Sequence, residues 1–145
     1  MTPNSIDAEV VTRRLRIVKD SLSDLESIGA VTTDRYQNEP ITRAAIERLL
    51  QVIVDVAIDI NAHVSTARLL KAPVTGRESF LAMAEVGALT SELAERLAPS
   101  ASMRNILVHR YADIDPAVVV AAVPKAITEF TEYVRAVSEY LRQPD

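Results

Sequence analysis

Apolar residues spaced three and four apart restrict the fold of this chain more than any other feature. They recur between residues 11 and 25, between 46 and 64, and between 123 and 141. This spacing places apolar side chains on one face of an α-helix. The 145 residues include only three glycines, fewer than the turns of a sheet protein normally require. The sequence therefore predicts an all-α, antiparallel helical bundle.

The long helices can be placed from these patterns. The first is expected to be capped at Ser5 and to stop at Gly29, followed by a polar connection that ends at Pro40. The second should run from Ile41 to about Thr66 and lie centrally, because apolar residues cover most of its circumference. The first, second and last long helices are expected to form the core. Eight side chains in particular should be buried: Leu15, Leu22, Leu50, Ile53, Ala57, Ile127, Phe130 and Val134.

Shorter helices are indicated by capping signals between residues 75 and 116. Thr75 precedes Glu78 at capping-box spacing, and Thr90 should cap a helix that ends before or bends at Pro99. Asp115 followed by Pro116 is typical of a helix start. Pro124 should kink the last helix or split off a short first piece.

Composition limits the domain count and the cellular setting. A chain of 145 residues is expected to form one domain, residues 1–145, with a substantial core. Cysteine is absent, which excludes thiolate nucleophiles and thiolate metal sites and fits a cytoplasmic location. The N-terminus has no signal-peptide pattern, and the longest apolar run is too short to span a bilayer, so no membrane association is expected.

The candidate site is the segment RNILVHRY, residues 104–111, with the pattern R-x-x-x-x-H-x-Y. It holds one of only two histidines, and Asn105 and Arg110 add polar and basic side chains beside Arg104, His109 and Tyr111. A net charge of −4 argues against an indiscriminate nucleic-acid binder, so any RNA contact should be local and made by a few arginines.

These residue types suit RNA cleavage without a metal. Histidine, whose ordinary pKa is about 6.5, can remove the proton from a ribose 2′-hydroxyl. The planar arginine can hold the phosphate and offset developing charge, and a tyrosine can orient a phosphate or stack on a base. Because one histidine cannot easily serve as both base and acid, a two-fold dimer with two motifs in one cleft is expected. A lone histidine near a helix end is more often a capping or packing residue.

The region around the motif resembles the HepT-like ribonuclease toxins of the HEPN superfamily. The resemblance covers MAEVGALTSELAERLAPSASMRNILVHRYADID (residues 83–115), ERLLQVIVDVAIDINAHV (47–64) and EFTEYVRAVSEYL (129–141). It implies a HEPN bundle, a homodimer and a metal-independent endoribonuclease in a type VII-like toxin–antitoxin pair. No cofactor is implied.

The resemblance also implies roles for single residues. Arg104 and His109 would be catalytic, Asn105 would support them, and Arg104 and Arg110 would contact RNA. Tyr111 matches the tyrosine to which a nucleotidyltransferase antitoxin transfers adenylyl groups. An additional basic residue, Arg110, is the one departure from the family pattern that we note. The alternative is a non-catalytic HEPN module that serves only as the partner of a nucleotidyltransferase.

A narrow polar stripe on the central helix offers a second candidate. Asp55 and Asp59 lie one turn apart, with His63 a further turn on. The two carboxylates could bind a metal, form a solvated stripe or form a salt bridge to Arg104. His63 is expected to pair with Asp59. With no cysteine and two isolated histidines, a transition-metal site is not expected.

Overall fold

The computed structural model describes residues 5–109 and 113–144, and all regular structure in these ranges is helical. The all-α prediction is confirmed. The helices are α1 (Ala8–Ser27), α2 (Thr33–Asn38), α3 (Pro40–Leu69), α4 (Gly76–Glu85), α5 (Ser91–Leu97), α6 (Ser100–His109) and α7 (Pro116–Arg142). In the described ranges, none of them is long and apolar enough to cross a membrane.

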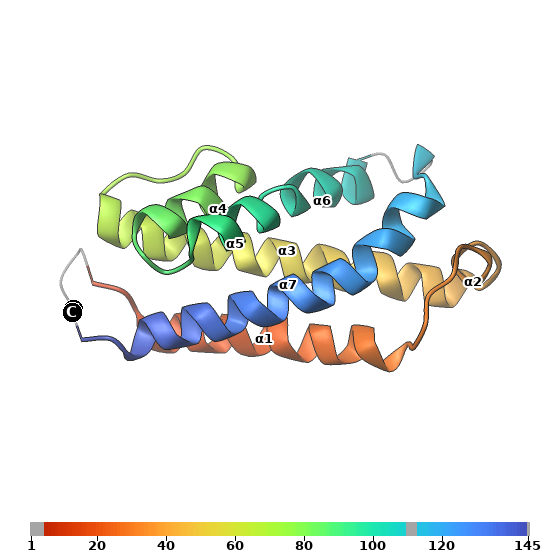
Figure 1. Ribbon diagram of the computed structural model, residues 1–145, viewed down its shortest axis with the longest axis horizontal. Coiled ribbons are helices and arrows are strands. Elements are labelled where there is room, and N and C mark those ends of the chain that lie inside the picture. Colours follow the sequence, from red (N-terminus) through yellow and green to blue (C-terminus); the bar gives the residue numbers. More distant parts are fainter. Residues whose placement is uncertain (1–4, 110–112, 145) are drawn as a thin grey trace.

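Three long helices form the body of the bundle. The central helix α3 packs against α1, and α7 lies along both (Figure 1). The direction of α3 and α7 is opposite to that of α1, so the start of α1 and the end of α7 lie at one end of the molecule. Helices α4, α5 and α6 cover the other side of α3, and α6 runs back toward the end that carries α2. This arrangement places α6 directly against the middle of α3.

Most helix starts follow the capping signals in the sequence. The hydroxyl groups of Thr75 and Thr90 and the carboxylate of Asp115 accept hydrogen bonds from backbone amides in the first turns of α4, α5 and α7. The predicted cap of α1 is wrong by two residues, because Asp7 and not Ser5 accepts the bond from Val10 N. Helix α7 continues through Pro124 as one element, so no separate first piece is formed.

Residues 31–40 are not only a connection, since they include α2. Its single buried side chain is Tyr36, whose hydroxyl donates a hydrogen bond to Glu47 Oε1 at 2.7 Å. Burial, together with this bond and the nearby Glu47 charge, raises the pKa of the Tyr36 phenol far above its ordinary value. A single buried side chain in a polar segment produces no apolar periodicity, so the spacing of apolar residues did not predict this helix.

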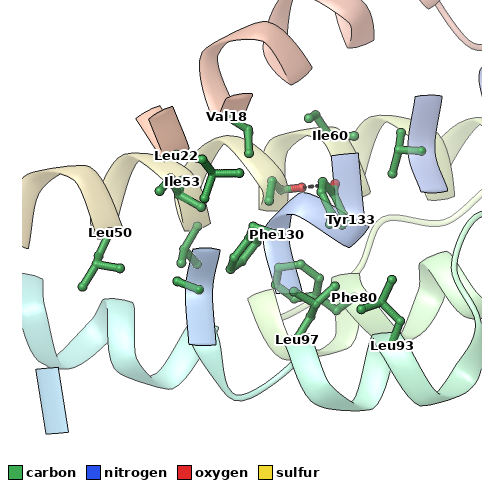
Figure 2. Packing of buried hydrophobic residues seen from close by; sticks show 14 of the residues in the cluster. Val18, Leu22, Leu50, Ile53, Ile60, Phe80, Leu93, Leu97, Phe130 and Tyr133 are labelled. Atoms are coloured by element: carbon green, nitrogen blue, oxygen red, sulfur yellow. Dashed lines mark hydrogen bonds between the residues drawn. The ribbon is translucent and has the colours of Figure 1, made fainter. Parts of the chain in front are cut away.

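The core centres on three aromatic rings from α4 and α7. Phe80, Phe130 and Tyr133 meet edge to face, with ring centroids 5.9–6.2 Å apart (Figure 2). Leucine and isoleucine side chains of the neighbouring helices surround this cluster. The predicted burial is confirmed for six side chains: Leu15, Leu22, Leu50, Ile53, Ala57 and Phe130.

The predicted face of α7 is displaced by part of a turn. Ile127 and Val134 are only partly buried at the edge of the core, and the residues that precede them, Ala126 and Tyr133, point inward instead. Tyr133 can do so because its hydroxyl donates a hydrogen bond to Asn61 Oδ1 at 2.6 Å. The spacing of the large aliphatic residues predicted the wrong centre for this face, because it did not include Ala126 and Tyr133.

Candidate functional site

Helix α6 carries the N-terminal part of the motif. It begins directly after Pro99, and the Ser100 hydroxyl donates a hydrogen bond to Leu97 O at 2.6 Å. The helix then continues through His109, its last residue. Arg110 and Tyr111 lie outside the described residues, so the expectations placed on them remain predictions.

The regular helix separates Arg104 from His109. Five residues of α-helix correspond to a rotation of about 140° and a rise of about 7.5 Å. His109 is exposed, and no hydrogen bond or ion pair joins it to Arg104 within the described part of the chain. Asn105 is also exposed and lies one turn before His109 on a neighbouring line of the helix surface.

Arg104 makes the principal polar contact of the site. Its Nε atom donates a hydrogen bond to Asp55 Oδ1 across the interface of α6 with α3, at 2.5 Å. Its Nη1 atom also donates to Asn105 Oδ1 at 3.3 Å. The Arg104 and Asp55 side chains are 28% and 34% exposed, so this charged pair is partly shielded from water. Of the three roles considered for Asp55, the salt bridge to Arg104 is the one that the structure shows.

A surface depression of about 460 Å³ opens beside this ion pair. Its walls come from α3, from the start of α4 and from α6. The residues that line it are Asp55, Ile58, Asp59, Gly76, Ala101, Arg104 and Asn105. A guanidinium, an amide and a carboxylate from two different helices thus meet at one polar hollow.

Gly76 allows the helices that surround the depression to approach one another. A Cβ atom at this position would lie 2.7 Å from Ile58 Cδ1 and 3.1 Å from Ala101 Cβ. Both distances are shorter than a comfortable contact between carbon atoms. This packing role depends on contacts with residues far away in the chain, so the local sequence pattern does not indicate it.

His63 does not pair with Asp59 as predicted. Its Nε2 atom instead accepts a hydrogen bond from the backbone amide of Asp7, at 3.0 Å, where α1 begins. The acceptor role of Nε2 requires that the ring proton be on Nδ1. Asp59 is exposed, and no group of three potential metal-ligating side chains occurs among residues 5–109 and 113–144.

Comparisons with known proteins identify the family to which this fold belongs. Residues 18–137 match the family described as Ribonuclease HepT-like. The tRNA nuclease HepT of Aphanizomenon flos-aquae is 35% identical over 137 residues, which cover 94% of this chain and 93% of that protein. The mRNA nuclease HepT of Shewanella oneidensis is 22% identical over 126 residues, covering 87% of this chain and 94% of that protein.

A solved structure has the same fold. It is a tri-AMPylated HEPN toxin of Shewanella oneidensis in complex with an MNT antitoxin, with a TM-score of 0.79 and 19% identity. The superposition covers 96% of this chain and 99% of that toxin. The all-α bundle thus has the fold of that HEPN toxin. The chain belongs to the HepT-like ribonuclease family, which confirms the predicted family and the prediction of an enzyme.

Proposed function

We propose that this chain is a toxin ribonuclease that cleaves RNA with Arg104 and His109. The observation that carries the proposal is the Arg104 guanidinium, which Asp55 holds at the edge of a polar depression on the helix that ends at His109. A guanidinium held in one position can donate parallel hydrogen bonds to a phosphodiester, and an exposed imidazole can transfer a proton. Membership of a ribonuclease family supports this assignment.

The proposed reaction is an internal transesterification. His109 takes the proton from a ribose 2′-hydroxyl, and the oxygen attacks the adjacent phosphorus. The bond to the 5′-oxygen then breaks, and that oxygen receives a proton as it leaves. The products are a 2′,3′-cyclic phosphate and a 5′-hydroxyl. Arg104 neutralises the charge that develops on the phosphate oxygens. Proton transfer and charge neutralisation are supplied by side chains, so the reaction should not require a metal.

The need for a base and an acid favours a homodimer. Each chain provides one histidine in the motif, so a second copy in the same cleft would supply the other proton-transfer group. An apolar depression of about 370 Å³ beside α6, between α5 and α7, supports an interface there. Met103 and Val118 both line it, and the Val118 side chain is exposed.

The proposed partner is a nucleotidyltransferase antitoxin, as in the solved complex from Shewanella oneidensis. The acceptor would be Tyr111, two residues after His109. Adenylyl groups there would place phosphates next to Arg104 and Arg110. These phosphates would occupy the guanidinium groups and repel the incoming RNA backbone.

Replacement of the two catalytic residues tests the function. His109→Ala and Arg104→Ala should each lower the rate of RNA cleavage by about 100-fold or more, because general base catalysis and phosphate stabilisation each contribute at least that much. Exposed Arg13 on α1 provides the control, and Arg13→Ala should cleave like the wild type. Cleavage should persist in EDTA and leave 2′,3′-cyclic ends.

Three results would contradict the proposal in different ways. Full activity of His109→Ala would exclude histidine catalysis, and loss of activity in EDTA would indicate a metal. Wild-type protein that cuts no RNA but still accepts adenylyl groups would support the alternative of a non-catalytic module that serves a nucleotidyltransferase.

A further inference from the structure

Asp55 contacts the motif from another helix, 49 residues earlier in the chain. We infer that Asp55 is a positioning residue, which holds the Arg104 guanidinium so that its remaining donors face the phosphate of the substrate. This inference rests on the proposed function, because it assigns Arg104 to phosphate binding. Its structural part, the anchoring of Nε, can be tested without any measurement of activity.

The bond to Asp55 uses the Nε donor of Arg104 and leaves the end of the guanidinium, with Nη1 and Nη2, to face a phosphate. A guanidinium has five N–H donors. Asp55 Oδ1 receives the donor on Nε, and Asn105 Oδ1 receives one from Nη1. The other three donors, on Nη1 and Nη2, make no hydrogen bond within residues 5–109 and 113–144, and we assign them to the phosphate. Two parallel N–H bonds to a phosphate are the strong mode of arginine recognition.

Anchoring matters because a free arginine side chain adopts many rotamers. Fixing such a side chain in one rotamer costs conformational entropy. The partly buried bond to Asp55 fixes the side chain before substrate binds. The entropy loss is therefore not added to the activation free energy of cleavage. The neighbouring Asp59 is more exposed and lies one turn farther along α3, where it lines the same depression without an ion pair to Arg104 among the described residues.

The charge of Asp55 distinguishes positioning from simple binding. A carboxylate beside the phosphate site repels the phosphate and therefore weakens ground-state affinity. A residue whose role was to bind the phosphate would carry a positive charge. Removal of the charge should consequently lower kcat while KM stays the same or falls. A loss of binding would instead raise KM.

The experiment compares Asp55→Asn with a matched ion-pair variant, Glu132→Gln. Glu132 on α7 pairs with Arg96 on α5 at 3.1 Å, and both side chains are 40% exposed, close to the exposure of the Asp55 pair. Asp55→Asn should lower kcat by about 10- to 100-fold, the effect expected for misplacement of a catalytic group, without raising KM. Asp55→Glu should recover part of the loss because it restores a carboxylate. Glu132→Gln should keep wild-type kcat and KM.

A second readout follows the Nε–H proton of Arg104 by NMR. In the wild type this proton should exchange slowly with water, and the protection should be lost in Asp55→Asn but kept in Glu132→Gln. An unprotected Nε–H in the wild type would overturn the inference, and so would unchanged kcat in Asp55→Asn. If circular dichroism shows that Asp55→Asn is unfolded, Asp55→Glu takes its place in the test. Full kcat together with an unprotected Nε–H in Asp55→Glu would then overturn the inference.

Failure of the proposed function has a different signature. Wild-type protein without ribonuclease activity would reject that function. The protection of Arg104 Nε–H, and its dependence on Asp55, would still show whether Asp55 anchors the guanidinium.

Discussion

Tyr133 shows how one hydroxyl group shapes the core. The residue is fully buried, and its hydroxyl lies 2.6 Å from Asn61 Oδ1 and 3.2 Å from Ala57 O. Asn61 in turn donates a hydrogen bond to Ser79 Oγ at 3.1 Å, which links α7 to α4 through α3. Burial raises the pKa of the Tyr133 phenol well above its ordinary value, so this group acts as a donor at all physiological pH values.

Tyr133→Phe should therefore be destabilising although the ring is retained. The substitution leaves the buried Asn61 carbonyl oxygen without its closest donor, which costs about 1–3 kcal/mol. Urea unfolding should show a lower midpoint with an unchanged m-value. Tyr140→Phe is the control, because the Tyr140 hydroxyl bonds to Arg68 Nε at the surface and its loss should cost under about 0.5 kcal/mol. Equal effects of the two variants would contradict a special role for the buried network.

The sequence indicated the contacts of some site residues but not those of others. The three-or-four spacing put Asp55 on the polar stripe of the central helix, which made contact with Arg104 one of its possible roles. A choice among those roles required the position of α6 against α3. The bond from Asp7 N to His63 was not predictable, because a ring nitrogen that accepts a backbone amide 56 residues away leaves no pattern in the sequence.

At the scale of helices, strong apolar periodicity was reliable, and the predicted caps were correct except at the start of α1. The long helices and the starts of α4, α5 and α7 appear where these signals lie. Helix α2 was missed because its six residues bury only one side chain. The face of α7 was misjudged because partners on other helices, not the residue type alone, determine whether a tyrosine is buried.

The packing of α4 against α3 and α6 provides a test at this scale. Gly76→Ala should lower stability by about 1–3 kcal/mol, since the new methyl group would overlap Ile58 Cδ1 and crowd Ala101. Because these residues line the depression, we also expect slower RNA cleavage. Thermal unfolding and single-turnover cleavage are the measurements.

A compensating substitution serves as the control. Ile58→Val removes the Cδ1 atom that the new methyl group would meet, so it should restore much of the stability lost in Gly76→Ala. If the double variant were no more stable than the sum of the two single effects predicts, steric overlap with Ile58 would not be the cause.

At the scale of the whole molecule, the proposed reaction needs a base and an acid, and one chain supplies a single histidine in the motif. His109 is exposed at the end of α6, the helix that runs toward the end of the bundle that carries α2 (Figure 1). The apolar depression formed by α5, α6 and α7 lies on the same helix as the motif. An interface at this depression would cover Val118, which is 48% exposed in the single chain, and would bring two copies of α6 near one another.

Val118→Asp should therefore prevent formation of the proposed dimer and stop RNA cleavage together, because a buried unpaired carboxylate at an interface is strongly unfavourable. Sedimentation equilibrium at micromolar concentration measures the association, and circular dichroism verifies that the helices are intact. Val74 is the matched control, since it is 87% exposed but lies in the loop before α4 and does not line this depression. Val74→Asp should remain dimeric and active. Because the second imidazole comes from the partner in this scheme, an active monomeric Val118→Asp variant would show that one chain contains the complete catalytic site.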